Sequence, residues 1–257
     1  MLLLLSPAKR LDMSEAPASA PEVTTPRFAE DAAALARTLR AKSEAEIGGL
    51  MRLSDDLARL NRERFRRFGE QAGAPALLAF AGDVYRGLDA RSLDAAGLAR
   101  AQDTVRILSG LYGLLRPLDV IEPYRLEMGT KLRTRGAGDL YAYWGDRIAR
   151  AVEADLAGHE DRLVVNLASN EYAKAALPHV EAPVITPVFR EVKDGQARTL
   201  ALFAKRARGL MTRWVLDEGI AGAGDLRGFD REGYAFDAAA SDERTLAFTR
   251  PQPPKKS

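Results

Sequence analysis

The chain has no cysteine and only two histidines among its 257 residues. Without cysteine it can form no disulfide bond, no thiol nucleophile and no thiolate metal site. The histidines, His159 and His179, stand in polar, loop-like sequence without the spacing of metal ligands, so a histidine-based iron site is not expected either. We therefore predict a protein with no metal and no cofactor.

Long hydrophobic runs and a strong excess of one charge are also missing. The only apolar run at the N-terminus, Leu2 to Leu5, is too short for a signal peptide or a membrane span. The 38 basic and 36 acidic residues leave a net charge of +2, which by itself indicates no nucleic acid. We expect a cytoplasmic protein without membrane contact. Only 8 of the 38 basic residues are lysine, so a single arginine carries little information.

The composition of the chain suits one domain of mixed α/β (α+β) structure. A hydrophobic fraction of 46% is ample for a core. We expect a single compact domain over residues 1–250, followed by a disordered tail, "PQPPKKS", at 251–257. Neither a phosphate-binding G-x-x-x-x-G-K-[ST] motif nor a convincing G-x-G-x-x-G motif occurs.

The hydrophobic pattern gives the elements of this domain. Continuous apolar runs at 2–5 and 163–169 predict buried strands. The segments at 182–192 and 197–204, separated by Asp194-Gly195, predict a β-hairpin. The expected helices span 28–41, 43–51 with a capping box, 55–68, about 92–108, about 139–156 and about 205–217, and short strands are expected at 233–237 and 245–250.

The segment "LSGLYGLLRPLD", residues 108–119, breaks an expected helix twice within four residues. Glycine lets a backbone adopt positive φ and come close to another group. We interpret Gly110, Tyr112 and Gly113 as a turn that starts a second short helix, whose free N–H groups could bind a phosphate. Arg106 and Arg116 would flank it. The alternative is an ordinary corner between two helices with a glycine cap.

The segment "AKRARGLMTRWVLDEG" predicts a helix with one basic side. Ala207, Leu210, Met211, Trp214 and Val215 fall on one side at 100° per residue. The other side carries Lys205, Arg206, Arg208, Thr212 and Arg213, with Gly209 among them. Glycine costs about 1 kcal/mol there relative to alanine, so we interpret Gly209 as allowing a phosphate to approach, and expect Gly209→Ala to stabilise the free protein. The alternative is a solvated surface helix.

Two strand-to-loop junctions and several acids complete the candidates. "SPAK" after the first strand and "SNEYAK" after the second would meet at one sheet edge, where Lys9 and Lys174 bring positive charge. Asp83, Glu127, Asp146 and Glu171 stand in motif-like contexts. They could converge as a metal or acid–base cluster, although such acids more often cap helices or pair with arginines.

The strings "LLLLSPAKRLD", "LAFAGDVYRGL", "LSGLYGLLRPLDVIEPYRLEMGTKL", "VVNLASNEYAKA" and "AKRARGLMTRW" occur in the order found in the peroxide stress protein YaaA family, which the chain resembles from residue 1 to about 250. The resemblance implies a family-specific α/β fold with a helix-hairpin-helix and a basic cleft. It also implies peroxide resistance, effects on free iron and DNA damage, and DNA binding without clear sequence choice. Arg10 stands where the family has a small polar residue.

We therefore expect a peroxide-stress protein that binds duplex or distorted DNA through backbone phosphates, as a monomer that can assemble cooperatively on DNA. Besides the hairpin and the basic helix, Lys9, Arg125 and Lys174 would form the cleft. One alternative is a metal-dependent hydrolase or nuclease that uses Asp83, Glu127 and Glu171. A second is an iron-sequestering protein, which the lack of cysteine and histidine disfavours.

Overall fold

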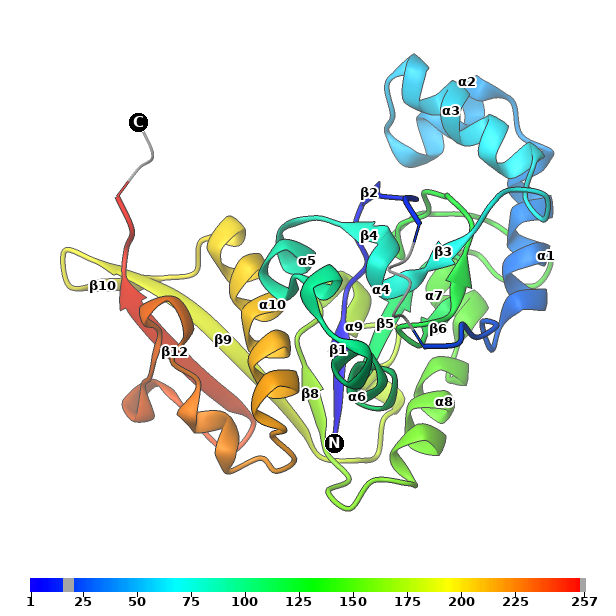
Figure 1. Ribbon diagram of the computed structural model, residues 1–257. Coiled ribbons are helices and arrows are strands. Elements are labelled where there is room, and N and C mark those ends of the chain that lie inside the picture. The colour runs from blue at the N-terminus through cyan, green and yellow to red at the C-terminus, as the bar shows by residue number, and fades with distance from the viewer. Residues whose placement is uncertain (16–20, 255–257) are drawn as a thin grey trace.

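The computed structural model describes residues 1–15 and 21–254 and is organised around one mixed sheet (Figure 1). Its strand order is β11-β12-β9-β8-β1-β5-β6, with β10 paired to β9. The strands β5, β1, β8, β9 and β12 are mutually parallel, and the antiparallel β6, β10 and β11 are attached to them. The expected mixed α/β architecture is confirmed.

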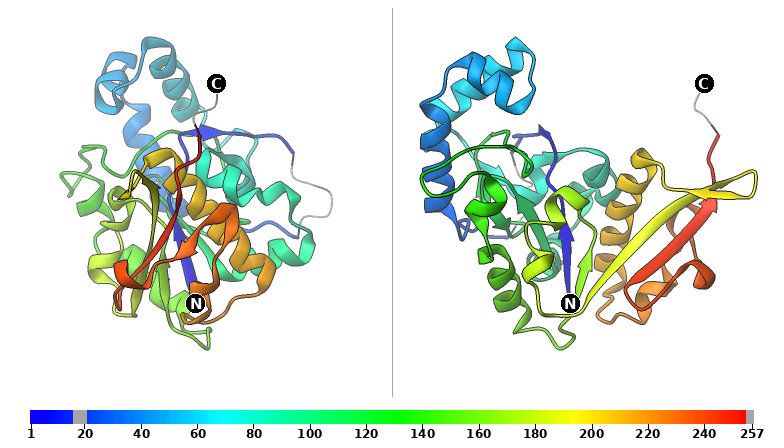
Figure 2. Two further views of the ribbon diagram at one scale, coloured as in Figure 1. Left: turned by 90° about the vertical axis from the view of Figure 1, so that its left-hand side faces the viewer. Right: turned by 180° about the vertical axis from the view of Figure 1, so that it is seen from behind.

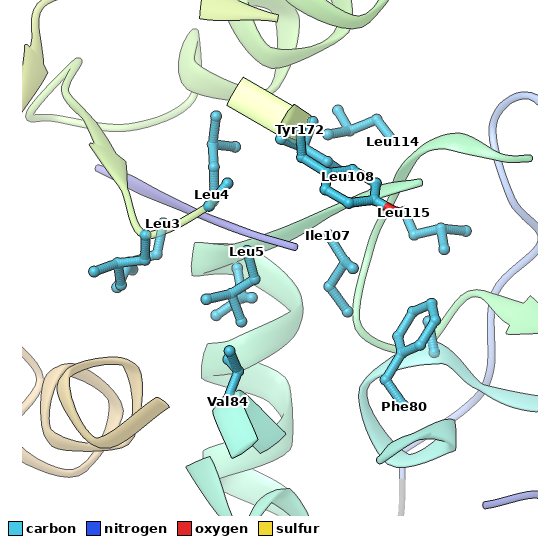
Figure 3. Packing of buried hydrophobic residues seen from close by; sticks show 14 of the residues in the cluster. Leu3, Leu4, Leu5, Phe80, Val84, Ile107, Leu108, Leu114, Leu115 and Tyr172 are labelled. Carbon is cyan, nitrogen blue, oxygen red and sulfur yellow. The ribbon is translucent and has the colours of Figure 1, made fainter. Parts of the chain in front are cut away.

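The centre of the sheet is the apolar N-terminal run. β1 (Leu2–Leu5) is buried along its whole length between β5 (Val105–Ser109) and β8 (Val164–Asn166). A strand covered on both faces needs apolar side chains at every position, which explains the unbroken leucines. Leu4 and Leu108 lie on the side of Tyr172, whereas Leu5 lies on the side of Val84 (Figure 3).

Three helices follow the first strand. α1 (Ala29–Arg40), α2 (Glu44–Met51) and α3 (Asp55–Arg66) match the expected helices, and the predicted capping box of Ser43 and Glu46 is present. Arg52 adopts a left-handed conformation that ends α2 and lets α3 fold back along it. The α2–α3 pair stands out from the sheet in every view (Figures 1 and 2).

Short elements connect this pair to β5. The strand pairs are β2 (Arg10–Leu11) with β4 (Phe80–Ala81), and β3 (Ala74–Pro75) with β7 (Val120–Ile121). The helices are α4 (Ala76–Ala79), α5 (Asp83–Leu88), the 3-10 turn η1 (Ala90–Ser92) and α6 (Ala95–Thr104).

The expected helix-hairpin-helix at 92–119 is wrong. α6 ends at Thr104, and the next residues form β5, a three-residue turn and β6 (Gly113–Leu115), which pairs antiparallel with β5. The β5 strand is buried on both faces, so it carries no alternation of polar and apolar residues that would distinguish it from a helix. This glycine-containing segment is therefore a β-hairpin at the edge of the sheet.

The expected helix at 139–156 is divided into two. α7 (Leu140–Trp144) ends where Gly145 adopts positive φ, and α8 (Arg147–Leu156) continues after it. β8 leads into the short α9 (Asn170–Ala173) and the 3-10 turn η2 (Leu177–His179). Figure 3 places Tyr172 of α9 on the opposite side of β1 from Val84 of α5.

The last part of the chain extends the sheet. β9 (Val184–Lys193) and β10 (Gln196–Arg198) form the expected hairpin, but α10 (Ala201–Glu218) already begins four residues before the expected helix. The 3-10 turns η3 (Asp225–Gly228), η4 (Arg231–Gly233) and η5 (Ala238–Ala240) surround β11 (Ala235–Phe236) and precede β12 (Thr245–Pro251).

The expected disordered tail overlaps this last strand. β12 runs to Pro251, and the N–H of Gln252 donates to the carbonyl of Val192, while residues 255–257 lie outside the described residues. In the described part of the chain, no helix combines the length and apolar character that crossing a membrane requires.

Candidate functional site

A pocket of about 480 Å³ lies beyond the carboxyl end of β1, and we refer to it as the β1 pocket. Ser169 follows β8, and its N–H donates to the hydroxyl of Ser6 over 2.9 Å, which joins the two strand ends. The hydroxyl of Tyr85 donates to the carbonyl of Ser6 over 2.9 Å. The expectation that the "SPAK" and "SNEYAK" junctions meet at one sheet edge is therefore confirmed.

Nine charged side chains line the β1 pocket. They are the basic Lys9, Arg10, Arg86, Arg125, Lys205 and Arg208 and the acidic Asp83, Glu127 and Glu171. Glu127 is shared, because Lys9 Nζ lies 3.1 Å and Arg125 Nη2 3.2 Å from its Oε1. Asp83 pairs with Arg86 at 3.0 Å. Glu171 instead accepts the N–H of Gly129 over 2.8 Å.

Three cations of this pocket, Arg10, Lys205 and Arg208, form no ion pair within residues 1–15 and 21–254. Burial lowers the pKa of Arg208, because no nearby carboxylate compensates the desolvation of its guanidinium. Arg125 also has a buried Nε–H without a hydrogen-bond acceptor. The Nε–H of Arg125 and the buried guanidinium of Arg208 are under-satisfied among the described residues, which is the condition under which a bound anion is favourable. Arg10 and Lys205 are exposed to solvent.

A second pocket of about 700 Å³ adjoins the first, and we call it the α2 pocket. Glu127 and Glu171 line both pockets, so the two are adjacent, and we refer to them together as the groove. Further lining comes from both ends of α2 and from the loop after Glu127. It includes the basic Lys42, Arg52 and Lys131 and the acidic Glu46. The groove thus collects nine basic and four acidic side chains, a surplus of five positive charges in a chain whose net charge is +2.

The groove contains some of the site residues expected from the sequence, namely Lys9, Arg125, Lys205 and Arg208. Lys174 is exposed but lines neither pocket. Sequence reasoning missed Lys42, Arg52, Arg86 and Lys131 as cations of the groove, because they come from loops and helix ends without a motif. Arg10 was noticed only as a departure from the family pattern, although it directly follows a junction that we had identified.

Arg106 and Arg116 do not flank a phosphate site. Arg106 is only 5% exposed and forms an ion pair with Asp155 at 2.6 Å. Arg116 pairs with the buried Asp119 at 2.9 Å. Both guanidiniums are engaged by carboxylates of the protein, although Arg116 is partly exposed.

The hairpin glycines approach protein groups. A Cβ at Gly110 would lie 2.4 Å from the carbonyl oxygen of Leu126, and one at Gly113 would lie 2.8 Å from the Trp144 ring. Tyr112 is only 4% exposed, and its hydroxyl accepts the N–H of Glu122 over 3.1 Å. The interpretation of a close backbone approach holds, but the approaching groups belong to the protein itself.

Most residues expected on the basic side of α10 also contact other groups of the protein. Gly209 is buried, and a Cβ there would lie 1.8 Å from the carbonyl oxygen of Val84 in α5. Arg206 pairs with Glu232 at 2.6 Å, and Arg213 pairs with Asp217 at 2.8 Å. Thr212 is fully buried. Only Lys205 and Arg208 of this side therefore line the groove without an acidic partner.

The three acids of the hydrolase alternative do share the β1 pocket, but Asp83 and Glu127 are engaged by cations and Glu171 by a backbone N–H. Asp146 instead pairs with Arg150. Among the residues that the structure describes, no group of three or more histidine, aspartate or glutamate side chains could hold a metal ion.

The fold and this site define a mixed α/β protein with a charged groove at the carboxyl ends of its central strands. Residues 1–240 match the protein family described as peroxide stress protein YaaA. The chain is 49% identical over 257 residues to a UPF0246 protein of Phenylobacterium zucineum, covering 99% of this chain and 96% of that protein. It is 51% identical over 257 residues to a UPF0246 protein of Burkholderia thailandensis, covering 97% and 98%. A UPF0246 protein of Janthinobacterium sp. (strain Marseille) is 49% identical over 255 residues, again covering 97% and 98%. The chain belongs to the YaaA peroxide-stress family.

Proposed function

We propose that the groove binds DNA through its backbone phosphates, without sequence choice, during peroxide stress. The observation that carries this proposal is the surplus of five positive charges in one groove. The rest of the chain is then net negative by three charges, so an anionic polymer is attracted to this surface and repelled elsewhere. Phosphate contacts of this kind supply most of the affinity of nonspecific DNA binding.

The origin of the groove cations favours contacts to phosphates over contacts to bases. They come from the loop after β1, from α5, from the loops at 125 and 131, from both flanks of α2 and from α10. Reading of base edges requires several side chains on one element that enters the major groove. Scattered cations follow a backbone and position it, which predicts binding to many sequences with similar affinity.

This binding offers a route by which the protein limits iron-driven damage without holding iron. DNA carries a condensed layer of cations, and a protein that neutralises phosphates releases them. Ferrous ions held in that layer would be displaced from the DNA covered by the groove. Peroxide would then react with iron in solution, away from the sugar and base atoms.

A pair of lysine variants tests the proposal. Lys205 and Lys174 are both exposed, but only Lys205 lines the groove. Fluorescence anisotropy with a labelled duplex should show several-fold weaker binding by Lys205→Ala and unchanged binding by Lys174→Ala. The salt dependence of Lys205→Ala should also be flatter by about 0.9 in the slope of log K against log salt. Equal effects of the two substitutions would place the DNA outside the groove.

A further inference from the structure

The β1 pocket has the size of a small-molecule site. Its volume of about 480 Å³ lies within the range of about 300–1,000 Å³ typical of pockets that enclose a ligand. A DNA duplex is far too wide to enter it, so phosphate contacts along the groove leave the interior of the pocket unexplained.

The lining of the pocket combines aromatic and apolar walls with cations. Tyr85, Tyr124 and Tyr172 are each less than 8% exposed, and Val84 and Leu126 also line the pocket. The hydroxyl of Tyr85 donates to the carbonyl of Ser6, and that of Tyr124 lies 2.6 Å from the hydroxyl of Ser109. With these hydroxyls engaged, it is ring carbons that these tyrosines contribute to the pocket lining, and an aromatic group can pack against them.

Cations without an acidic partner stand at the same pocket. Arg208 and Lys205 lie one helical turn apart on α10, and neither forms an ion pair among the described residues. The buried Nε–H of Arg125 adds a donor without an acceptor. A guanidinium donates several hydrogen bonds in a plane that matches the oxygens of a phosphate.

We infer that the β1 pocket takes one nucleotide unit, with its phosphate at Arg208 and Lys205 and its base against the tyrosine wall. The carboxylates of Glu127 and Glu171 in the same lining are acceptors for the amino groups or hydroxyls of the nucleoside. The unit can be a free nucleotide or a nucleotide rotated out of a DNA strand. The second source rests on the proposed function, because it requires that DNA lie in the groove.

Calorimetric titration of the 257-residue chain measures binding of a free nucleotide. Deoxyadenosine 5′-monophosphate should bind, whereas deoxyadenosine, which lacks the phosphate, should bind much more weakly. Arg208→Met keeps the apolar stem but removes the charge, and should weaken monophosphate binding about 10-fold or more. Lys205→Ala, at an exposed position that tolerates truncation, should weaken it as well, whereas Lys174→Ala should not.

A mismatched duplex measures extrusion from DNA. A duplex with one mismatched pair has the same number of phosphates as its matched control, but its bases cost less to unstack. The wild type should bind the mismatched duplex more tightly, and Arg208→Met should lose this preference. Monophosphate binding that depends on Arg208 without a mismatch preference would identify the free nucleotide as the source.

Two other results separate the inference from the proposed function. Duplex binding with neither mismatch preference nor monophosphate binding would overturn the nucleotide pocket and leave the proposed function intact. Monophosphate binding that depends on Arg208 in a protein that binds no DNA would support the pocket and overturn the proposed function.

Discussion

Gly209 lies where α10 crosses α5, and its missing side chain is what lets the two helices touch. A Cβ at this position would meet the carbonyl oxygen of Val84 at 1.8 Å, and one at Gly87 on the facing helix would meet that of Arg206 at 2.2 Å. Both contacts are with backbone, which cannot move without separating the helices. The expectation that Gly209→Ala stabilises the protein is therefore wrong.

We predict that Gly209→Ala lowers the free energy of unfolding by at least about 2 kcal/mol, as overpacking of a core does. Gly49 is the matched control, because it also lies inside a helix but a Cβ there would meet no heavy atom of another element within 4 Å. Gly49→Ala should stabilise by up to about 1 kcal/mol. Urea denaturation of both variants measures the difference, and a Gly209→Ala protein as stable as the wild type would contradict the close crossing.

Asp155 is held in its charged form by two arginines. Burial would raise the pKa of Asp155, but hydrogen bonds and charges from Arg106 and Arg27 outweigh it, so its pKa lies below the ordinary value of 3.8. A carboxyl whose pKa is lowered on folding stabilises the fold above its unfolded-state pKa, and this stabilisation is lost as pH falls through the folded-state pKa.

Asp155→Asn should therefore cost about 3 kcal/mol at neutral pH, because it leaves Arg106 buried without its partner. The difference between wild type and variant should narrow as the pH falls below about 3.8, because the carboxyl of the unfolded chain is protonated there while that of the folded protein keeps its charge to lower pH. Urea denaturation of both proteins at neutral pH and at about pH 3 measures this difference in the free energy of unfolding. A difference that does not change with pH would show that the charge of Asp155 is unimportant.

At the scale of elements, the β5–β6 hairpin has a structural role in place of the expected contact with DNA. Tyr112 packs against Tyr124 with ring centroids 5.3 Å apart and accepts the N–H of Glu122. Tyr112→Phe should keep the packing and lose the hydrogen bond, which costs about 1 kcal/mol.

The affinity of Tyr112→Phe for duplex DNA should be unchanged, because the ring is buried and lines neither pocket. Anisotropy measurements alongside Lys205→Ala provide the comparison. A loss of DNA affinity in Tyr112→Phe without loss of stability would return the hairpin to the DNA interface.

The sequence predicted those features that depend only on the local order of residues along the chain. Continuous leucines predicted the central strand, and the polar junctions after two buried strands predicted a site at their shared edge, which the bond between Ser6 and Ser169 confirms. The helical spacing of apolar residues, together with the capping residues, likewise predicted α1, α2 and α3.

Sequence reasoning failed where the answer depends on a distant neighbour. A glycine that faces a ligand and a glycine that faces another backbone have the same local sequence, so Gly110, Gly113 and Gly209 could not be assigned. An arginine likewise gives no sign of its partner. Asp155 is 49 residues from Arg106, and Glu232 is 26 residues from Arg206, and only the fold brings them together.

At the scale of the whole molecule, three acids share a pocket with many cations, which raises the question of catalysis. Each acid is engaged by a cation or a backbone N–H, so none is free to position a metal-bound water. We predict that the purified protein leaves plasmid DNA uncut in the presence of magnesium, manganese or ferrous iron under anaerobic conditions. Metal-dependent cleavage that is lost in Glu127→Gln would favour the hydrolase alternative.

The central claim is that one groove holds phosphates through cations that the protein leaves unpaired. Five of the nine groove cations form no ion pair in the described part of the chain: Arg10, Arg52, Lys131, Lys205 and Arg208.

The most direct test is the salt dependence of duplex binding. If each of the five neutralises one phosphate, log K against log salt should have a slope of roughly −4.5. Lys131→Ala, at an exposed position that lines only the α2 pocket, should flatten it by about one unit, while Lys174→Ala leaves it unchanged. A wild-type slope near zero, or the same slope in wild type and Lys131→Ala, would contradict the account.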